Sequence, residues 1–131
     1  MHGGRWNSAG RRVVYTSQSL ALAALEMLVH IPADLAPADL VALTIEIPDD
    51  LFVDVFESAT LPGDWNNYAD SEECRLVGDA WVAAGSAAVL QVPAAPVPQE
   101  HNFLISVAHP GAHRIGVVNQ RSFRFDPRLV K

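Results

Sequence analysis

The sequence predicts an α+β fold: a compact single domain with a mixed or antiparallel sheet core and two to three helices. Its 131 residues suit one domain, because single domains commonly contain ~100–200 residues. Half of the residues are hydrophobic and 18% are charged, which excludes an intrinsically disordered chain. Short β-branched stretches are mixed with amphipathic stretches along the chain, and this order is typical of α+β proteins.

The opening of the chain is rich in glycine and predicts a loop. It leads into residues 12–16, whose valines, tyrosine and threonine predict a short strand. Ser17 or Ser19 can then cap a helix that runs to about His30, since Pro32 prevents its continuation.

The middle of the chain predicts a strand, a short helix and a loop. Residues 41–47 alternate large apolar side chains with smaller or polar ones, which is the pattern of a half-buried strand, and Pro48 closes it. Residues 49–59 form a second amphipathic stretch, for which we expect a short helix. Residues 61–67 contain many turn-forming residues and predict a loop.

The second half of the chain predicts one more helix followed by strands. Asp70 or Ser71 opens this helix, and Gly85 ends it. Stretches rich in β-branched and aromatic residues then predict short strands at residues 88–92, 102–105, 114–118 and 123–125.

The net charge of −6 argues against direct nucleic-acid binding, because the phosphate backbone favours a basic surface. The basic residues are almost all arginine: Lys131 is the single lysine, and the other eight are arginines. Arginine offers a planar fork of donors that matches phosphate and carboxylate groups. A coding bias toward GC-rich codons is the simpler explanation of this skew, and a site for an anionic small molecule is the other.

Several features favour a cytoplasmic protein without membrane contact. Cys74 is the only cysteine, so an intrachain disulfide is not possible. The N-terminus carries no apolar signal region. The most apolar run, residues 20–29, is much shorter than the ~20 residues that a membrane span requires.

Glu26 does not fit its surroundings in the sequence. The helix predicted around it has no polar face over residues 20–29, so we expect this helix to be buried on nearly all sides. A carboxylate in such a place loses its hydration unless a cation or several donors reach it. Glu26 therefore reaches an edge of the helix, pairs with an arginine or lines a pocket.

Candidate nucleotide contacts precede this helix. Tyr15 lies in the strand immediately before it, and Arg5 and Trp6 lie in the loop before that strand. An arginine for phosphate, two aromatic side chains for a ring and a carboxylate in one strand–helix unit suit a nucleotide. Trp6 is also expected to pack the loop onto the sheet.

Many segments of the chain resemble, in order and spacing, the RES-domain family. The resemblance covers nearly the whole chain, so we expect residues 1–131 to form a single RES domain. The matching segments are residues 3–8, 13–17, 22–26, 78–81, 89–93, 102–104, 109–110 and 123–126.

This resemblance implies a function. RES-domain proteins are toxins of bacterial type II toxin–antitoxin modules, their fold is related to ADP-ribosyltransferases, and they arrest growth by consuming cellular NAD+. The cognate antitoxin is a small helix-turn-helix protein that blocks the active-site cleft. The resemblance thus implies NAD+ as a substrate with no separate cofactor, water or inorganic phosphate as the acceptor, and an antitoxin as the protein partner.

The resemblance also implies roles for individual residues. Glu26 is the expected catalytic acidic residue, which orients the ribose and stabilises positive charge as the glycosidic bond breaks. Arg5 is expected to contact a phosphate or the nicotinamide ribose during catalysis, and Tyr15 is the expected pocket aromatic. The remaining residues expected to contact NAD+ are Trp6, Ser86 and Asn102.

The chain departs from the family pattern in two respects. Family members usually carry a further N-terminal strand that contributes an arginine, so we expect an N-terminally short domain. Ala94 stands where the family often has a serine, and Ser86 is the candidate substitute for it. Ser106 likewise stands where asparagine is common.

Two other functions stay open at this point. A truncated RES domain with weak activity would act as a protein-binding module, which the short N-terminus and Ala94 favour. A protein ADP-ribosyltransferase would instead leave ADP-ribose on a macromolecule. A metal site is not expected at His101, His109 and His113, because the proline and glycine between the last two prevent a helix that would bring their rings together.

Overall fold

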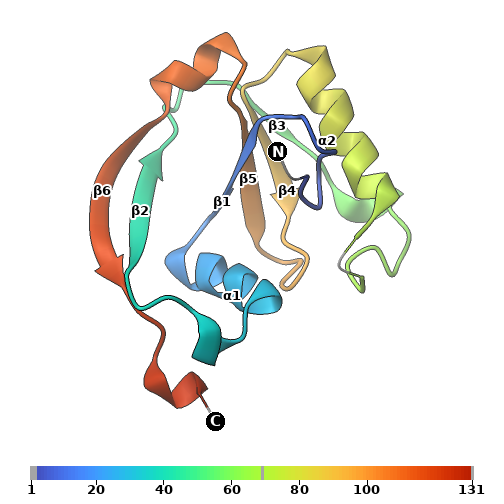
Figure 1. Ribbon diagram of the computed structural model, residues 1–131. Helices are drawn as coiled ribbons and strands as arrows, with labels where there is room; N and C mark the ends of the chain where they lie inside the picture. The colour runs from blue at the N-terminus through green and yellow to red at the C-terminus, as the bar shows by residue number, and fades with distance from the viewer. Residues whose placement is uncertain (1–2, 69, 131) are drawn as a thin grey trace.

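The computed structural model describes residues 3–68 and 70–130, which form two α-helices and two β-sheets, and this confirms the predicted α+β class (Figure 1). The larger sheet has the strand order β1-β5-β4-β3. Strand β1 (Val13–Ser17) pairs antiparallel with β5 (His101–Ser106), and β5 pairs antiparallel with β4 (Val89–Pro93). Strand β3 (Val53–Val55) joins the other side of β4 in parallel, so the sheet is mixed.

Residues 49–59 do not form the predicted short helix. Their centre is β3, and a 3₁₀ turn follows it at Ser58–Thr60. The alternation of valine with aspartate at residues 53–55 has the period of a strand, and the parallel partner β4 supplies the hydrogen bonds. The tertiary pairing therefore decided the structure of a stretch whose amphipathic pattern was too short to distinguish helix from strand.

The smaller sheet consists of β2 (Leu40–Glu46) and β6 (Gly116–Phe123), paired antiparallel. It lies on the side of the larger sheet away from α2 (Figure 1). The sequence predicted two strands, at residues 114–118 and 123–125, where the structure has the single strand β6. Residues 119–122 are polar, but they are exposed and continue the pairing with β2, so their polarity does not interrupt the strand.

Helix α1 (Leu20–His30) begins where its cap predicts. The Ser19 hydroxyl accepts a hydrogen bond from the amide of Leu22, which confirms one of the two expected caps. The prediction that the helix is buried on nearly all sides is wrong. Leu22 is buried at 2% exposure, whereas Leu20, Leu25 and Val29 are exposed. The helix lies near one end of the larger sheet (Figure 1).

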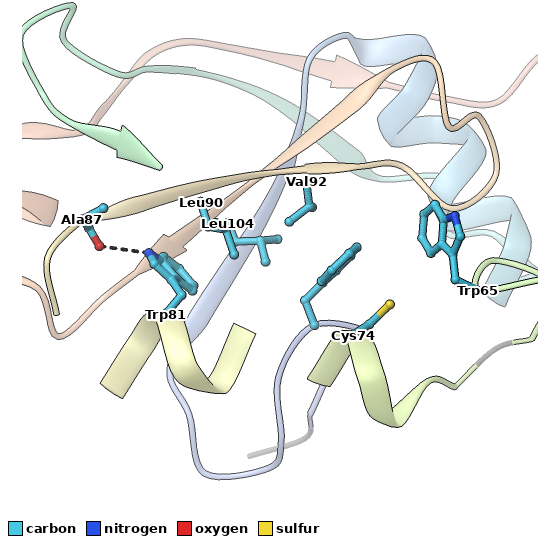
Figure 2. Packing of buried hydrophobic residues seen from close by; sticks show 8 residues of the cluster. Trp65, Cys74, Trp81, Ala87, Leu90, Val92 and Leu104 are labelled. Carbon is cyan, nitrogen blue, oxygen red and sulfur yellow. Dashed lines mark hydrogen bonds between the residues drawn. The ribbon is translucent and has the colours of Figure 1, made fainter. Parts of the chain in front are cut away.

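Helix α2 (Glu72–Ala84) has the predicted ends. The Ser71 hydroxyl accepts from the amide of Cys74, and Gly85 closes the helix in the left-handed conformation, with φ of 67°. The helix packs against one face of the larger sheet, and the main apolar core lies between them (Figure 2). The buried residues of this core are Trp6, Trp65, Cys74, Trp81, Ala87, Leu90, Val92 and Leu104.

A second apolar cluster lies on the opposite face of the larger sheet. Its buried residues are Ala88, Val89 and Ile105, and Ile45 of β2 packs against them. No helix among the described residues is long and apolar enough to cross a membrane. The remaining 3₁₀ turns are Ala33–Leu35, Pro110–Arg114 and Pro127–Leu129.

Candidate functional site

The loop before β1 is folded into the core through Trp6. Its indole packs edge-on to Phe56 with ring centres 5.7 Å apart, and it also contacts the Trp65 ring. This close approach depends on Gly78 in α2, because a Cβ at that position would lie 1.5 Å from the carbonyl oxygen of Trp6. The glycine therefore allows the loop backbone to rest directly on the helix.

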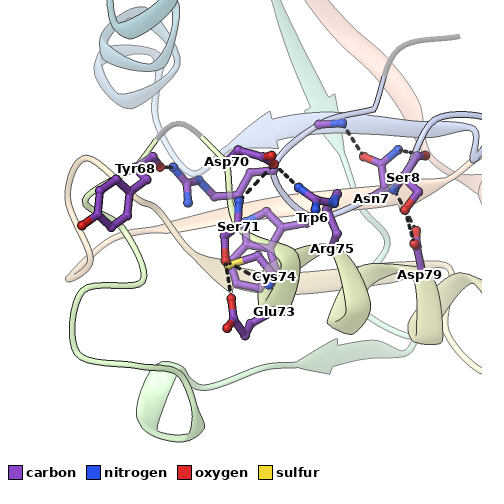
Figure 3. Close-up of polar contacts among 12 residues, drawn as sticks. Trp6, Asn7, Ser8, Tyr68, Asp70, Ser71, Glu73, Cys74, Arg75 and Asp79 are labelled. Carbon is purple, nitrogen blue, oxygen red and sulfur yellow. Dashed lines mark hydrogen bonds and ion pairs between the residues drawn. The ribbon is translucent and has the colours of Figure 1, made fainter.

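Polar contacts fix the rest of this loop. The amide and hydroxyl of Ser8 donate hydrogen bonds of 2.9 and 2.5 Å to the two carboxylate oxygens of Asp79 in α2 (Figure 3). Burial alone would raise the pKa of Asp79, but these two hydrogen bonds and the charges of Arg11 and Arg75 lower it below its ordinary value. The carboxylate thus holds the loop on α2 in its ionised form.

Tyr15 of β1 is a second anchor for the loop. Its hydroxyl accepts from the amide of Trp6 at 2.9 Å and donates to Oδ1 of the buried Asn7 at 2.5 Å. Burial raises the pKa of Tyr15 to about 12, and the hydrogen bond from Trp6 opposes this only in part. Because the hydroxyl is occupied, only the exposed ring of Tyr15 is free to contact a ligand.

A cleft of about 1080 Å³ opens beside this loop. Its walls come from the loop before β1, from β1, from α1, from the segment that leads into α2 and from residues 95–96 after β4. This size exceeds the range of ~300–1,000 Å³ that is usual for small-molecule sites, so the cleft has room for a dinucleotide. The polar and charged residues that line it include Arg5, Asn7, Tyr15, Ser17, Glu26, His30, Asn66, Asp70, Arg75 and Asn102.

Glu26 is held at one side of the cleft by Asn102. The side-chain amide of Asn102 donates a hydrogen bond to Oε2 of Glu26, and its Oδ1 accepts one from the Ser17 hydroxyl at 2.7 Å. Ser17 and Asn102 face each other in the β1–β5 register, and Asn102 is 5% exposed. Of the three outcomes considered for Glu26, the structure selects pocket lining. The ion pairs of the described residues do not include it.

Arg5 lies at another side of the cleft, beside the segment that leads into α2. Its Nη1 donates to the carbonyl oxygen of Trp65 at 3.1 Å, and its Nη2 donates to the carbonyl oxygen of Tyr68. The guanidinium carbon also lies 6.0 Å from the centre of the Trp65 ring, within reach of a cation–π interaction. Arg5 therefore connects the two segments that border the cleft, and it also presents a positive charge there.

Two of the residues expected to contact NAD+ do not offer their side chains to the cleft. Trp6 is among the residues that border the cleft, but it is only 2% exposed and its indole packs in the core, so its expected packing role is the one observed. Ser86 is exposed in the turn between α2 and β4, outside the cleft. Ser86 precedes β4, whereas the cleft-lining residues 95–96 follow the other end of that strand. The whole length of β4, with a rise of about 3.3 Å per residue, therefore separates Ser86 from this part of the cleft.

Ser86 therefore does not substitute for a serine at position 94. Ala94 itself is fully buried, and its amide donates to the carbonyl oxygen of Glu100 at 2.9 Å. Among the described residues that line the cleft just after β4, the structure thus has neither a serine at position 94 nor Ser86 in its place.

The structure adds His30 and Arg75 to the cleft, and sequence reasoning had given neither a role there. His30 follows Glu26 by four residues, so the two share one face of α1, and this spacing was the available signal. Arg75 belongs to the start of α2, and nothing in the local sequence indicates that it borders the same cleft as the loop before β1. The three histidines considered for a metal are not gathered with other potential ligands within the described residues.

Comparison with known proteins agrees with the family suggested by the sequence. The toxin Res of Photorhabdus laumondii is 37% identical over 132 residues, which cover 100% of this chain and 84% of that protein. The Prs ADP-ribosylating toxin of Sphingobium sp. strain YBL2 is 35% identical over 131 residues, 98% of this chain and 81% of that protein. The toxin Res of Yersinia enterocolitica is 33% identical over 129 residues, 98% of this chain and 84% of that protein.

The family model for the RES domain matches residues 1–126. The α+β fold with a cleft between its loop, sheet and first helix is therefore that of a RES domain, and the chain belongs to the RES-domain family. The family that the sequence predicted is confirmed.

Proposed function

We propose that this chain is a toxin enzyme that depletes cellular NAD+ by cleaving the bond between nicotinamide and ribose. The observation that carries the proposal is the placement of Glu26, which lines a cleft of dinucleotide size and is oriented there by Asn102. The similarity to proteins named as toxins, one of them ADP-ribosylating, supports the same chemistry.

The proposed reaction breaks the C–N glycosidic bond. Its electron pair leaves with the nicotinamide nitrogen, and positive charge develops on the ribose as in glycoside hydrolysis. The Glu26 carboxylate stabilises this charge, and the hydrogen bond from Asn102 keeps it in place before the substrate arrives. A water oxygen then bonds to the ribose carbon and releases its proton to the solvent, or an unprotonated oxygen of inorganic phosphate bonds there instead. NAD+ is thus the substrate, and no separate cofactor takes part.

The other contacts bind the rest of the dinucleotide. Arg5 borders the cleft away from Glu26 and offers positive charge to the phosphates, although two of its donors hold backbone carbonyls. The exposed ring of Tyr15 supplies a surface against which a planar base can stack. Glu26 therefore acts at the reactive end, and Arg5 and Tyr15 act in binding.

The group that accepts ADP-ribose distinguishes NAD+ degradation from the first alternative, which is ADP-ribosylation of a protein. The relative from Sphingobium is named as an ADP-ribosylating toxin, and by analogy this chain would transfer ADP-ribose to a protein. The test is incubation of the purified chain with NAD+ carrying a label on its adenine. Free labelled ADP-ribose or its 1-phosphate supports degradation, and label retained on a macromolecule supports transfer. Intact NAD+ in the presence of correctly folded protein would contradict both.

We further propose that a helix-turn-helix antitoxin neutralises the toxin in the cytoplasm by covering the cleft. In the remaining alternative, the chain binds such a partner but has no activity. If a small open reading frame lies beside its gene, co-expression of the two genes tests this. Growth arrest that the neighbouring product relieves supports a toxin–antitoxin pair. A stable complex without growth arrest or NAD+ loss would favour the binding module.

A further inference from the structure

A second arginine lines the cleft on the same side as Arg5. Arg75 belongs to the first turns of α2, and its side chain is only 29% exposed. Its Nη1 is paired with the carboxylate of Asp70, whose side chain is 78% exposed (Figure 3). The cation thus borders the cleft, while its partner is largely in solvent.

Arg5 alone is poorly suited to hold a diphosphate in this arrangement. A guanidinium has five N–H donors, and both terminal nitrogens of Arg5 donate to the backbone carbonyls of Trp65 and Tyr68. These bonds hold the segment that leads into α2, so breaking them would disturb the wall of the cleft. A diphosphate carries two negative charges and needs a further cation.

The N-terminus of α2 does not supply this positive charge. The Ser71 hydroxyl already accepts from the Cys74 amide, and Glu72 and Glu73 place negative charges in the first turn. An anion at this end of the helix would meet their repulsion, which offsets the favourable helix dipole. Arg75 is therefore the available cation near Arg5 among the described residues that line the cleft.

We propose that Arg75 is the second cationic contact for the diphosphate of the dinucleotide, and that Asp70 occupies its guanidinium until the diphosphate displaces this carboxylate. An exposed ion pair is weak, so the exchange of one carboxylate for a doubly charged diphosphate favours the bound state. The inference rests on the proposed function, since it assigns residues to the same substrate.

Binding of ADP-ribose by calorimetry is the experiment, because this probe keeps the diphosphate and lacks the nicotinamide. Arg75→Gln is expected to weaken binding about tenfold or more, the loss of one charge-assisted contact, and Arg75→Lys to weaken it less. Asp70→Asn is expected to tighten binding by about two- to threefold, because Arg75 is then free of its partner. The double variant should bind like Arg75→Gln, since the effect of Asp70 on the diphosphate is proposed to pass through Arg75. The other bond of Asp70, from the Ser71 amide to Oδ1, can be kept by the side-chain oxygen of asparagine.

Adenosine serves as the matched ligand without phosphate, and its affinity should be the same in all of these variants. Arg121→Gln on the exposed strand β6 is the matched control for loss of one arginine elsewhere. Wild-type affinity for ADP-ribose in Arg75→Gln would overturn the inference and leave the proposed function standing, as would weakened binding in Asp70→Asn. If the folded wild-type chain neither binds ADP-ribose nor cleaves NAD+, both the inference and the proposed function fail.

Discussion

The side-chain amide of Asn102 donates a hydrogen bond to the carboxylate of Glu26, and this bond joins helix α1 to strand β5 at the edge of the cleft. The orientation of the amide is set from its other side, where the Ser17 hydroxyl donates to Oδ1. Glu26 is therefore oriented by two residues that lie 85 positions apart in the chain and meet only through the β1–β5 pairing.

The first prediction concerns Asn102→Asp, which keeps the shape of the side chain and replaces the donor to Glu26 with a second carboxylate. Ser17 can still donate to one of its oxygens, so the other faces Glu26 and repels its carboxylate instead of donating to it. We expect the rate of nicotinamide release at neutral pH to fall by about tenfold or more, because Glu26 loses the contact that orients it. The measurement is the initial rate of nicotinamide release at saturating NAD+.

Asn119→Asp is the control for this prediction, because it adds the same charge at an exposed position of β6, a strand that does not line the cleft. Its rate of nicotinamide release should match that of the wild type. A wild-type rate in Asn102→Asp would contradict the positioning of Glu26 by Asn102.

The second prediction concerns the contact between the loop before β1 and helix α2. Gly78→Ala would place a Cβ 1.5 Å from the carbonyl oxygen of Trp6, so the loop or the helix must move. We expect the free energy of unfolding to fall by about 1–3 kcal/mol or more, as for other overpacked sites. Gly63→Ala is the matched control, because its Cβ meets nothing within 4 Å. Denaturant unfolding curves check the pair, and equal stability of the two variants would contradict the close approach.

The third prediction concerns the pH dependence of stability. Hydrogen bonds from Ser8 hold the pKa of Asp79 below its ordinary value of 3.8, so its contribution is complete above that value and is lost as the pH falls through the lowered pKa. We expect the wild type to have a higher Tm than Asp79→Asn at pH 7, and the difference to shrink below about pH 4. Asp39→Asn, at an exposed position, should show no such trend. A Tm difference that stays constant down to pH 2, about two units below the ordinary pKa, would contradict this role.

The elements that the sequence predicted well are those with local signals. The ends of α2 follow from Ser71 and Gly85, each of which acts on backbone groups within a few residues. Strand β3 was missed because its structure comes from pairing with β4, more than thirty positions later in the chain. Strand β6 was divided in the prediction because polarity was taken as an interruption, although an exposed strand tolerates polar residues on both faces.

In the candidate site, too, the sequence predicted the residues that have a local signal and missed the contacts that depend on tertiary packing. Arg5, Tyr15 and Glu26 were predicted from one strand–helix unit and its family resemblance, and all three line the cleft. The sequence could not show that the Tyr15 hydroxyl and the Arg5 terminal nitrogens are occupied by the backbone, because these contacts depend on how the loop folds onto α2. Arg75 reaches the cleft for the same reason, through the packing of α2 beside the loop.

The most direct test of the central claim compares nicotinamide release by the wild type and by Glu26→Gln at saturating NAD+. The glutamine keeps an oxygen that accepts from Asn102, so the fold and the affinity for ADP-ribose should persist. The negative charge is lost, and we expect kcat to fall at least about a hundredfold, the effect of removing one preorganised electrostatic contact to a transition state. Wild-type kcat in a folded Glu26→Gln protein would show that this carboxylate does not act in the reaction and would contradict the account.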